Sequence, residues 1–139
     1  MKTILLAIFA SAFVLISASA GAEEYDHPID AEMHAALKKA ENNAQFVQAY
    51  AMAQREWNQE MKRIYKQLQR KMKPEEWRTF RAAQNAWLSF RETQYRALGV
   101  VHGNTLGTMW RPIKASQFME ITRARVLFLE DLLELVEAR

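Results

Sequence analysis

The sequence predicts an all-α protein, a small antiparallel bundle of three or four helices that follows a cleaved signal peptide. Apolar residues recur with the 3.6-residue period of an amphipathic helix through most of the chain. The strand-like alternation and paired turn residues that predict β-hairpins are missing. The composition, 50% hydrophobic and 25% charged in 139 residues, suits one domain with one core.

Residues 1–22 have the features of a secretory signal peptide. A basic residue precedes the apolar run 4–16, and two A-x-A patterns end at Ala20 and Ala22. The run is shorter than the roughly 20 residues that a membrane-spanning helix requires. We therefore expect cleavage after one of these alanines, export to the periplasm or the medium, and a mature helical domain over residues 23–139.

Charge and cysteine content exclude several classes of protein. The formal net charge is +3, and loss of Lys2 with the signal peptide lowers it by one unit. The basic run at residues 62–73 is flanked by acidic residues, so we interpret it as a solvated helix face. With no cysteine in the chain, neither a disulfide nor a lipid anchor is expected. The sequence thus predicts no nucleic-acid partner and no membrane anchor after cleavage.

The first two helices are predicted on either side of Asn42 and Asn43. Asp30 can cap a first, short helix. A second apolar stripe, from Phe46 to Leu68, occupies a different face of the helical wheel. A break in the helix at the two asparagines would allow both apolar faces to pack against the same core.

Two further long helices are predicted around a glycine-containing loop. Pro74 suits the first turn of a third helix, which we expect to stop at Gly99. Residues 99–112 hold three of the four glycines and are predicted to be a loop. A last helix is expected from Ile113 to Glu137.

Two arginines fall within apolar helix faces. On a helical wheel, two polar residues of the third helix share an arc with three aromatic residues: Gln84 and Arg91 with Trp87, Phe90 and Tyr95. In the last helix, Arg125 lies in the apolar arc beside Thr122, and Arg123 and Glu130 lie on the opposite, solvent-facing side. A buried guanidinium requires a partner.

Periodicity suggests Glu60 and Asn58 as partners for these arginines. Two interpretations remain open. The polar residues can form a layer that fixes the helix register, or they can line a mouth between helices that receives a ligand or a protein. The residues concerned are Gln84, Arg91, Thr122 and Arg125.

The motif Ala83-Gln84-x-x-Trp87-x-x-Phe90-Arg91-Glu92, with Thr122-x-x-Arg125 further on, resembles the lysozyme inhibitor LprI-like family of exported bacterial proteins. The resemblance covers about residues 42–135. It implies a periplasmic helical domain, some of whose relatives inhibit lysozyme. The family usually carries cysteines, and their matching positions here hold Ala49, Tyr95 and Gln117. The position of a family acidic residue holds Asn58.

Enzymatic motifs are missing, because the chain has no cysteine nucleophile, G-x-S-x-G or H-E-x-x-H. His27, Asp30 and His34 have a spacing that can line one helix face with metal ligands, but Asp30 is better explained as a helix cap. We predict a protein that is not an enzyme and holds no cofactor or metal.

Lysozyme inhibition gives residues 99–111 a role. A glycosidase cleft contains two carboxylic groups, so an inhibitor requires a projecting segment with hydrogen-bond donors. The candidate donors are His102, Asn104, Thr105 and Arg111, with Trp110 as an aromatic anchor. The alternative interpretation is that the loop only joins two helices and Trp110 plugs the end of the bundle.

A second hypothesis is a periplasmic helical chaperone or stress-binding module of unknown partner. The mature chain contains six methionines, which can form an adaptable apolar surface: Met33, Met52, Met61, Met72, Met109 and Met119. A role as a component of a larger assembly is a third possibility. The sequence identifies neither the partner nor the oligomeric state.

Overall fold

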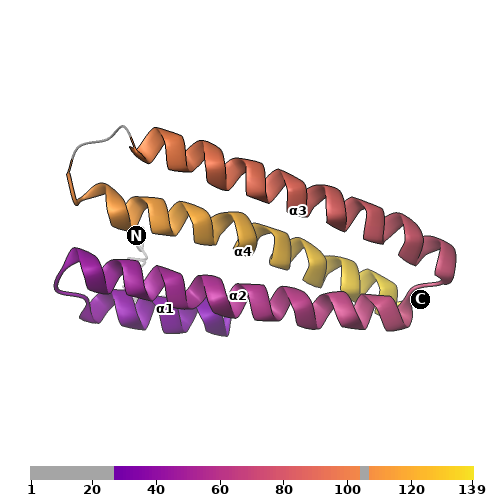
Figure 1. Cartoon of the computed structure of the whole chain (residues 1–139). Helices are drawn as coiled ribbons and strands as arrows, with labels where there is room; N and C mark the ends of the chain where they lie inside the picture. Colours follow the sequence, from indigo (N-terminus) through magenta and orange to yellow (C-terminus); the bar gives the residue numbers. More distant parts are fainter. Residues whose placement is uncertain (1–26, 104–106) are drawn as a thin grey trace, which may run out of the picture.

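The computed structural model describes residues 27–103 and 107–139, which form four α-helices and no strand (Figure 1). The helices are α1 (Pro28–Lys39), α2 (Asn43–Lys71), α3 (Pro74–Gly103) and α4 (Trp110–Glu137). Each helix runs antiparallel to the one before it, so α2 and α4 point the same way (Figure 1). The predicted all-α fold, with one short and three long helices, is confirmed. The predicted signal peptide lies outside the described residues.

The core is a seam between α2 and α4. Its fully buried apolar side chains come from both helices: Trp57, Ile64 and Leu68 from α2, and Met119, Val126 and Leu129 from α4. The buried positions of α4, from Met119 to Val136, alternate at intervals of three and four residues. This spacing is typical of helices that pack nearly parallel over a long distance. No helix within the described ranges is long and apolar enough to cross a membrane.

An ion pair fastens the start of α1 to α4. The Asp30 carboxylate is buried and accepts hydrogen bonds from Arg123 Nε, at 2.9 Å, and from Nη2, at 2.8 Å. His27 caps the helix instead of Asp30, since its Nδ1 accepts the Ile29 N–H at 3.1 Å and Pro28 occupies the first turn. The predictions that Asp30 is the cap and that Arg123 faces solvent were therefore wrong. Periodicity within one helix does not show that a neighbouring helix supplies a carboxylate.

Besides the cap of α1, three of the predicted helix boundaries are confirmed and two are wrong. Asn42 caps α2 through its side chain, and Pro74 begins α3. However, α3 continues through Gly99 to Gly103, because glycine in a helix costs only about 1 kcal/mol. α4 begins at Trp110, three residues before the predicted start, because a proline in the first turn needs no N–H partner. It ends at Glu137 as predicted.

α3 is the least buried of the three long helices. Only Phe80 and Gln84 of this helix are buried, and the helix diverges from α2 toward its carboxyl end (Figure 1). At its start, Trp77 packs edge-on against Tyr65 with ring centroids 4.8 Å apart. Phe90 was predicted to lie in the core and is instead 52% exposed, since no other helix of the described residues covers that side of α3.

We predict that Asp30→Asn lowers the free energy of unfolding by about 2 kcal/mol, because it leaves the Arg123 guanidinium without its carboxylate. The effect is smaller than for a fully buried pair since the Arg123 side chain is 32% exposed. Urea denaturation measures the change. Asp131→Asn, at an exposed position of the same helix as Arg123, is the control, and equal effects of the two variants would contradict the assignment.

Candidate functional site

Gln84 and Arg125 connect α3 to α4. Gln84 is 4% exposed, and its Oε1 accepts hydrogen bonds from Arg125 Nε at 3.0 Å and Nη2 at 2.8 Å. Burial lowers the pKa of the Arg125 guanidinium, which nevertheless stays charged at neutral pH. Its charge faces the rings of Trp87 and Phe128, at 5.5 and 5.1 Å. A neutral amide and two aromatic rings thus hold this arginine.

Arg91 connects α3 to α2. Its Nη1 donates to Asn58 Oδ1 at 2.8 Å, and its guanidinium lies 5.1 Å from the Trp87 ring and 5.7 Å from the Tyr95 ring. The predicted partner Asn58 is therefore confirmed, whereas Glu60 is not a partner. The Trp87 indole therefore contacts two arginine side chains, one from α3 and one from α4.

A third polar contact is centred on Tyr95. Its hydroxyl lies 2.9 Å from Thr122 Oγ1 and 3.2 Å from the Phe118 carbonyl, and it accepts from Gln54 Nε2 at 3.0 Å. Thr122 is fully buried, so this hydroxyl satisfies a polar group inside the α2–α4 seam. The four residues that sequence analysis grouped therefore do not share one mouth, because Thr122 meets Tyr95 and not an arginine.

These contacts support the polar-layer interpretation for Gln84, Arg125 and Thr122. Arg125 and Thr122 each bond to a side chain of α3, and the Gln84 carbonyl oxygen accepts both Arg125 hydrogen bonds. Of the remaining motif residues, Trp87 is the shared ring, and Glu92 is exposed on the outer side of α3. Arg91 differs from Arg125 and Thr122 because it also lines an open groove between α2 and α3, as Gln84 does.

A cluster of titratable groups at the start of α1 was not predicted. His27, Glu60 and Glu130 bring possible metal-ligand atoms within 4.8 Å of one another, and His27 Nε2 lies 3.3 Å from Glu130 Oε1. Burial raises the pKa of the Glu130 carboxyl, whereas a hydrogen bond from Arg63 lowers that of Glu60. Each residue comes from a different element, so no sequence spacing signals the cluster.

The donor chemistry of this cluster disfavours a metal ion. His27 Nδ1 accepts the Ile29 N–H, so the proton of a neutral ring resides on Nε2 and points to Glu130. A metal on Nε2 would require the proton on Nδ1, which would break the helix cap. Arg63 Nε also occupies both Glu60 oxygens, at 2.8 and 2.9 Å. The earlier alternative of His27, Asp30 and His34 fails as well, because Arg123 takes the Asp30 carboxylate.

Three of the five residues proposed for partner binding, His102, Trp110 and Arg111, lie where α3 and α4 join. We call residues 100–103 and 107–114 the α3–α4 end. His102 belongs to α3, and its Nε2 lies 2.6 Å from Gln117 Oε1 of α4. Trp110 and Arg111 form the first turn of α4. The connection is thus shorter than the predicted loop 99–112. Asn104 and Thr105 lie outside the described residues.

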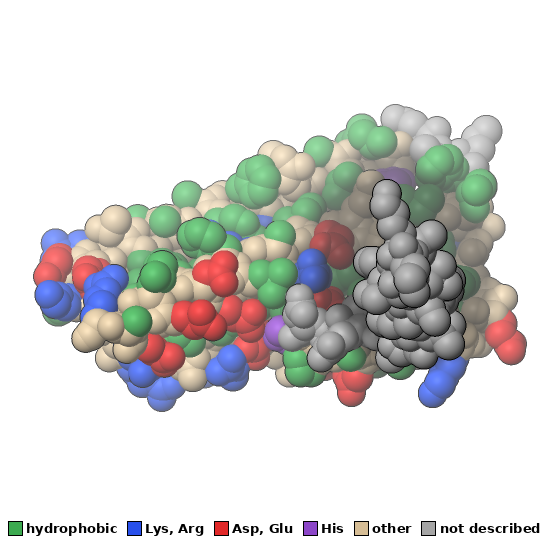
Figure 2. Space-filling view, turned by 180° about the vertical axis from the view of Figure 1, so that it is seen from behind, with side chains coloured by type: hydrophobic (Ala, Val, Ile, Leu, Met, Phe, Trp, Pro, Cys, Tyr) green, Lys and Arg blue, Asp and Glu red, His purple; other side chains and the backbone are tan. Residues whose placement is uncertain are grey.

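The α3–α4 end is apolar and carries only positive charge. It holds five of the nine large hydrophobic side chains exposed among the described residues: Val100, Val101, Met109, Trp110 and Ile113. Figure 2 shows hydrophobic side chains at the surface of this end, on the right. Arg111 and Lys114 accompany them, and no acidic residue occurs between Glu92 and Glu120. An exposed apolar patch of this kind indicates a protein-binding surface.

Comparison with known proteins identifies a family. The family model described as "Lysozyme inhibitor LprI" matches residues 22–129, which is most of the chain and includes the motif of α3 and both residues of Thr122-x-x-Arg125. The resemblance inferred from that motif is confirmed. No curated protein and no solved structure matches the chain. An inhibitor family agrees with the prediction of a protein that is not an enzyme.

We predict strong coupling between Gln84 and Arg125. Gln84→Met alone removes the only oxygen that the described residues offer to Arg125 and lowers the free energy of unfolding by about 2 kcal/mol. Adding Arg125→Met removes the unsatisfied charge, so the double variant is more stable than the sum of the single effects implies.

Urea denaturation of the two single variants and the double variant measures this coupling. Asn85→Met, at the exposed neighbouring position, is the matched control for introducing methionine into α3. Additive effects of the two substitutions would show that the hydrogen bonds contribute little to stability.

Proposed function

We propose, since the chain belongs to the LprI family of lysozyme inhibitors, that it binds a lysozyme and blocks the cleft with its α3–α4 end. The protein acts by occupying this cleft and catalyses no reaction. Its site of action is outside the cytoplasm, and export through a signal peptide over residues 1–22 would deliver it there.

The observation that carries the proposal is the absence of acidic residues from the exposed apolar end. A lysozyme cleft contains two carboxylic groups, so an inserted segment must supply cations or hydrogen-bond donors and no carboxylate. Arg111 supplies a guanidinium fork that matches a carboxylate, and Lys114 supplies a second cation. Trp110, 38% exposed, is a large, rigid anchor of the kind that dominates binding energy at interfaces.

Two hydrogen bonds also join the parts of the α3–α4 end to neighbouring helices. His102 joins the last turn of α3 to Gln117 of α4, and Asn43 Nδ2 donates to Thr108 Oγ1 at 3.4 Å. Gly107 has a φ of 108°, a conformation that residues with a side chain rarely adopt. A surface that is already ordered loses less conformational entropy on binding.

The chaperone alternative loses its main support in the structure. It requires methionines on an adaptable surface, but Met33, Met61 and Met119 are buried in the core. Of the six methionines expected in the mature chain, only Met109 is exposed. Met109 belongs to the α3–α4 end, so it adds to the proposed lysozyme-binding surface.

We predict that the exported protein inhibits lysis of bacterial cell walls by lysozyme in a dose-dependent manner. Replacing Trp110 and Arg111 together by alanine should weaken inhibition by about 100-fold or more, because the anchor and the guanidinium are both lost. A turbidity assay over a range of inhibitor concentrations measures the effect.

The matched control is Leu135→Ala combined with Arg78→Ala. These residues are also an exposed hydrophobic residue and an exposed arginine, but they lie at the other end of the bundle. The control should inhibit as the unsubstituted protein does. Equal inhibition by both double variants would exclude the α3–α4 end, and no inhibition by any form would exclude lysozyme as the partner.

A further inference from the structure

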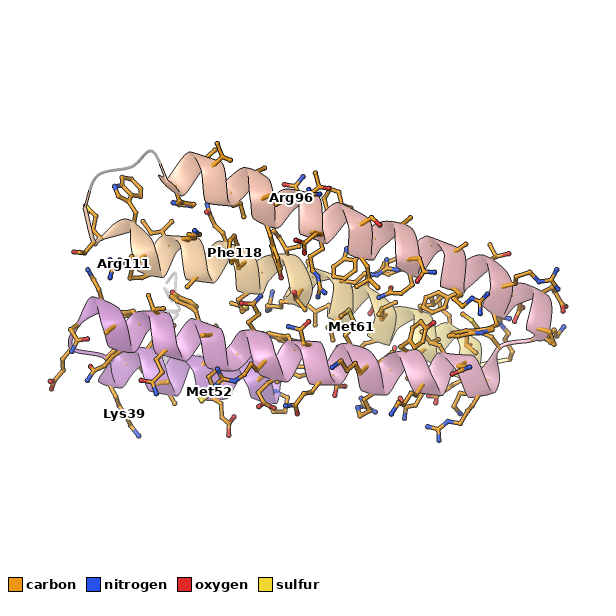
Figure 3. All side chains as sticks on the ribbon, viewed as in Figure 1. Lys39, Met52, Met61, Arg96, Arg111 and Phe118 are labelled. Atoms are coloured by element: carbon orange, nitrogen blue, oxygen red, sulfur yellow. The ribbon has the colours of Figure 1, made fainter. Side chains whose placement is uncertain are left out.

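A groove runs between α2 and α3, from the middle of the bundle toward the α2–α3 turn. Its volume is about 490 Å³, within the range of small-molecule binding sites. Three side chains give it an apolar floor and three give it a positive rim: Met61, Tyr65 and Leu88, and Lys62, Lys66 and Arg91. Figure 3 labels Met61 between α2 and the helices that face it. The groove is separate from the α3–α4 end.

The charges around the groove are not balanced. No acidic residue lines it. Lys62 and Lys66 are exposed one helical turn apart, where like charges repel. The acidic residues of the same part of α2, Glu56 and Glu60, line a different hollow with His27. This part of α2 therefore presents its carboxylates, with Arg63, to one side and presents Lys62 and Lys66 to the groove.

Arg91 has hydrogen-bonding capacity that the protein leaves unused. A guanidinium has five N–H donors, and within residues 27–103 and 107–139 it donates one hydrogen bond, to Asn58. No carboxylate in those ranges pairs with it. The rings of Trp87 and Tyr95 hold its position. Arg91 is therefore a fixed cation at the groove with donors to spare.

Gln84 offers a second donor, deeper in the groove. Its side chain is 4% exposed, and its Oε1 is fully used by Arg125. Within the described ranges its Nε2 donates only to the thioether sulfur of Met61, at 3.5 Å, and sulfur is a weak acceptor. A buried amide normally finds an oxygen acceptor. The weak partner of this nitrogen therefore indicates that a ligand in the groove supplies the acceptor.

We propose that the groove binds a small organic monocarboxylate with an apolar body, of the medium-chain fatty acid type. The carboxylate accepts hydrogen bonds from Arg91, the apolar body covers Met61, Tyr65 and Leu88, and Gln84 Nε2 supplies a donor at the floor. A monoanion is favoured over a phosphate because the buried donor is a neutral amide and a dianion costs more to desolvate. This site does not depend on lysozyme binding.

Titration calorimetry of the purified protein with decanoate tests the proposal. We expect saturable binding with one site, together with NMR shifts of the Gln84 side-chain amide and of Arg91 Nε–H. Decyltrimethylammonium, with the same chain and the opposite charge, should not bind saturably. Equal binding of the two compounds would mean that only the apolar chain is recognised and would overturn the proposal.

Variants assign the site. Arg91→Gln should weaken decanoate binding about tenfold or more, since it removes a charge-assisted hydrogen bond. Arg96→Gln is the control, because Arg96 is an exposed arginine of the same helix (Figure 3) that does not line the groove. Equal affinities of the two variants would overturn the proposal.

If circular dichroism shows that Arg91→Gln is unfolded, the double variant Lys62→Gln, Lys66→Gln replaces it in the test. We expect this variant to bind decanoate about threefold more weakly, and an unchanged affinity would contradict the proposal.

Two further measurements test the choice of a carboxylate ligand and show whether this site is distinct from the proposed lysozyme-binding surface. Decyl phosphate should bind no more tightly than decanoate, and tighter binding would overturn the choice of a carboxylate. The Trp110→Ala, Arg111→Ala variant should bind decanoate with unchanged affinity. A loss in that variant would place the fatty acid at the α3–α4 end and not in the groove.

Discussion

The two hydrogen bonds between Gln84 and Arg125 are the constraint on which the placement of α3 depends. α2 and α4 are joined by a long apolar seam, but α3 buries only Phe80 besides Gln84. Apolar burial is not directional and would tolerate a shift of α3 along the seam. The Gln84–Arg125 and Arg91–Asn58 contacts are directional and fix its register. Since α3 forms one wall of the groove and half of the α3–α4 end, both candidate sites depend on these contacts.

The sequence predicted the parts of the fold that depend on a single helix. Hydrophobic period, the asparagines between α1 and α2, and Pro74 are local signals, and the structure agrees with each. Contacts between helices were predicted less well. Asp30 is a plausible cap when α1 is considered alone. Its carboxylate instead pairs with Arg123 of α4, a contact that is visible only once the two helices are packed together. Gly99 was read as a stop, but a helix can include a glycine at a modest cost in free energy.

For the candidate sites as well, features of a single helix were predicted better than contacts between helices. The sequence identified Arg91 and Arg125 as arginines in apolar faces and named Asn58 as a partner, because these inferences use helical periodicity. It did not distinguish the structural role of Arg125 from the exposure of Arg91 to the groove. Arg125 is satisfied by a buried amide, whereas Arg91 faces a groove lined without any carboxylate. The His27, Glu60 and Glu130 cluster had no sequence signal, since its members come from three parts of the chain.

Charge is distributed unevenly over the molecule, and this distribution supports the proposed function. Acidic side chains gather in the middle of the face seen in Figure 2, whereas the α3–α4 end has none. The most direct test is hydrogen exchange of the protein alone and with a saturating lysozyme. The account predicts added protection in residues 100–103 and 107–114 and none around Glu60 and Glu130. Protection around Glu60 and Glu130 with none at the α3–α4 end would contradict it.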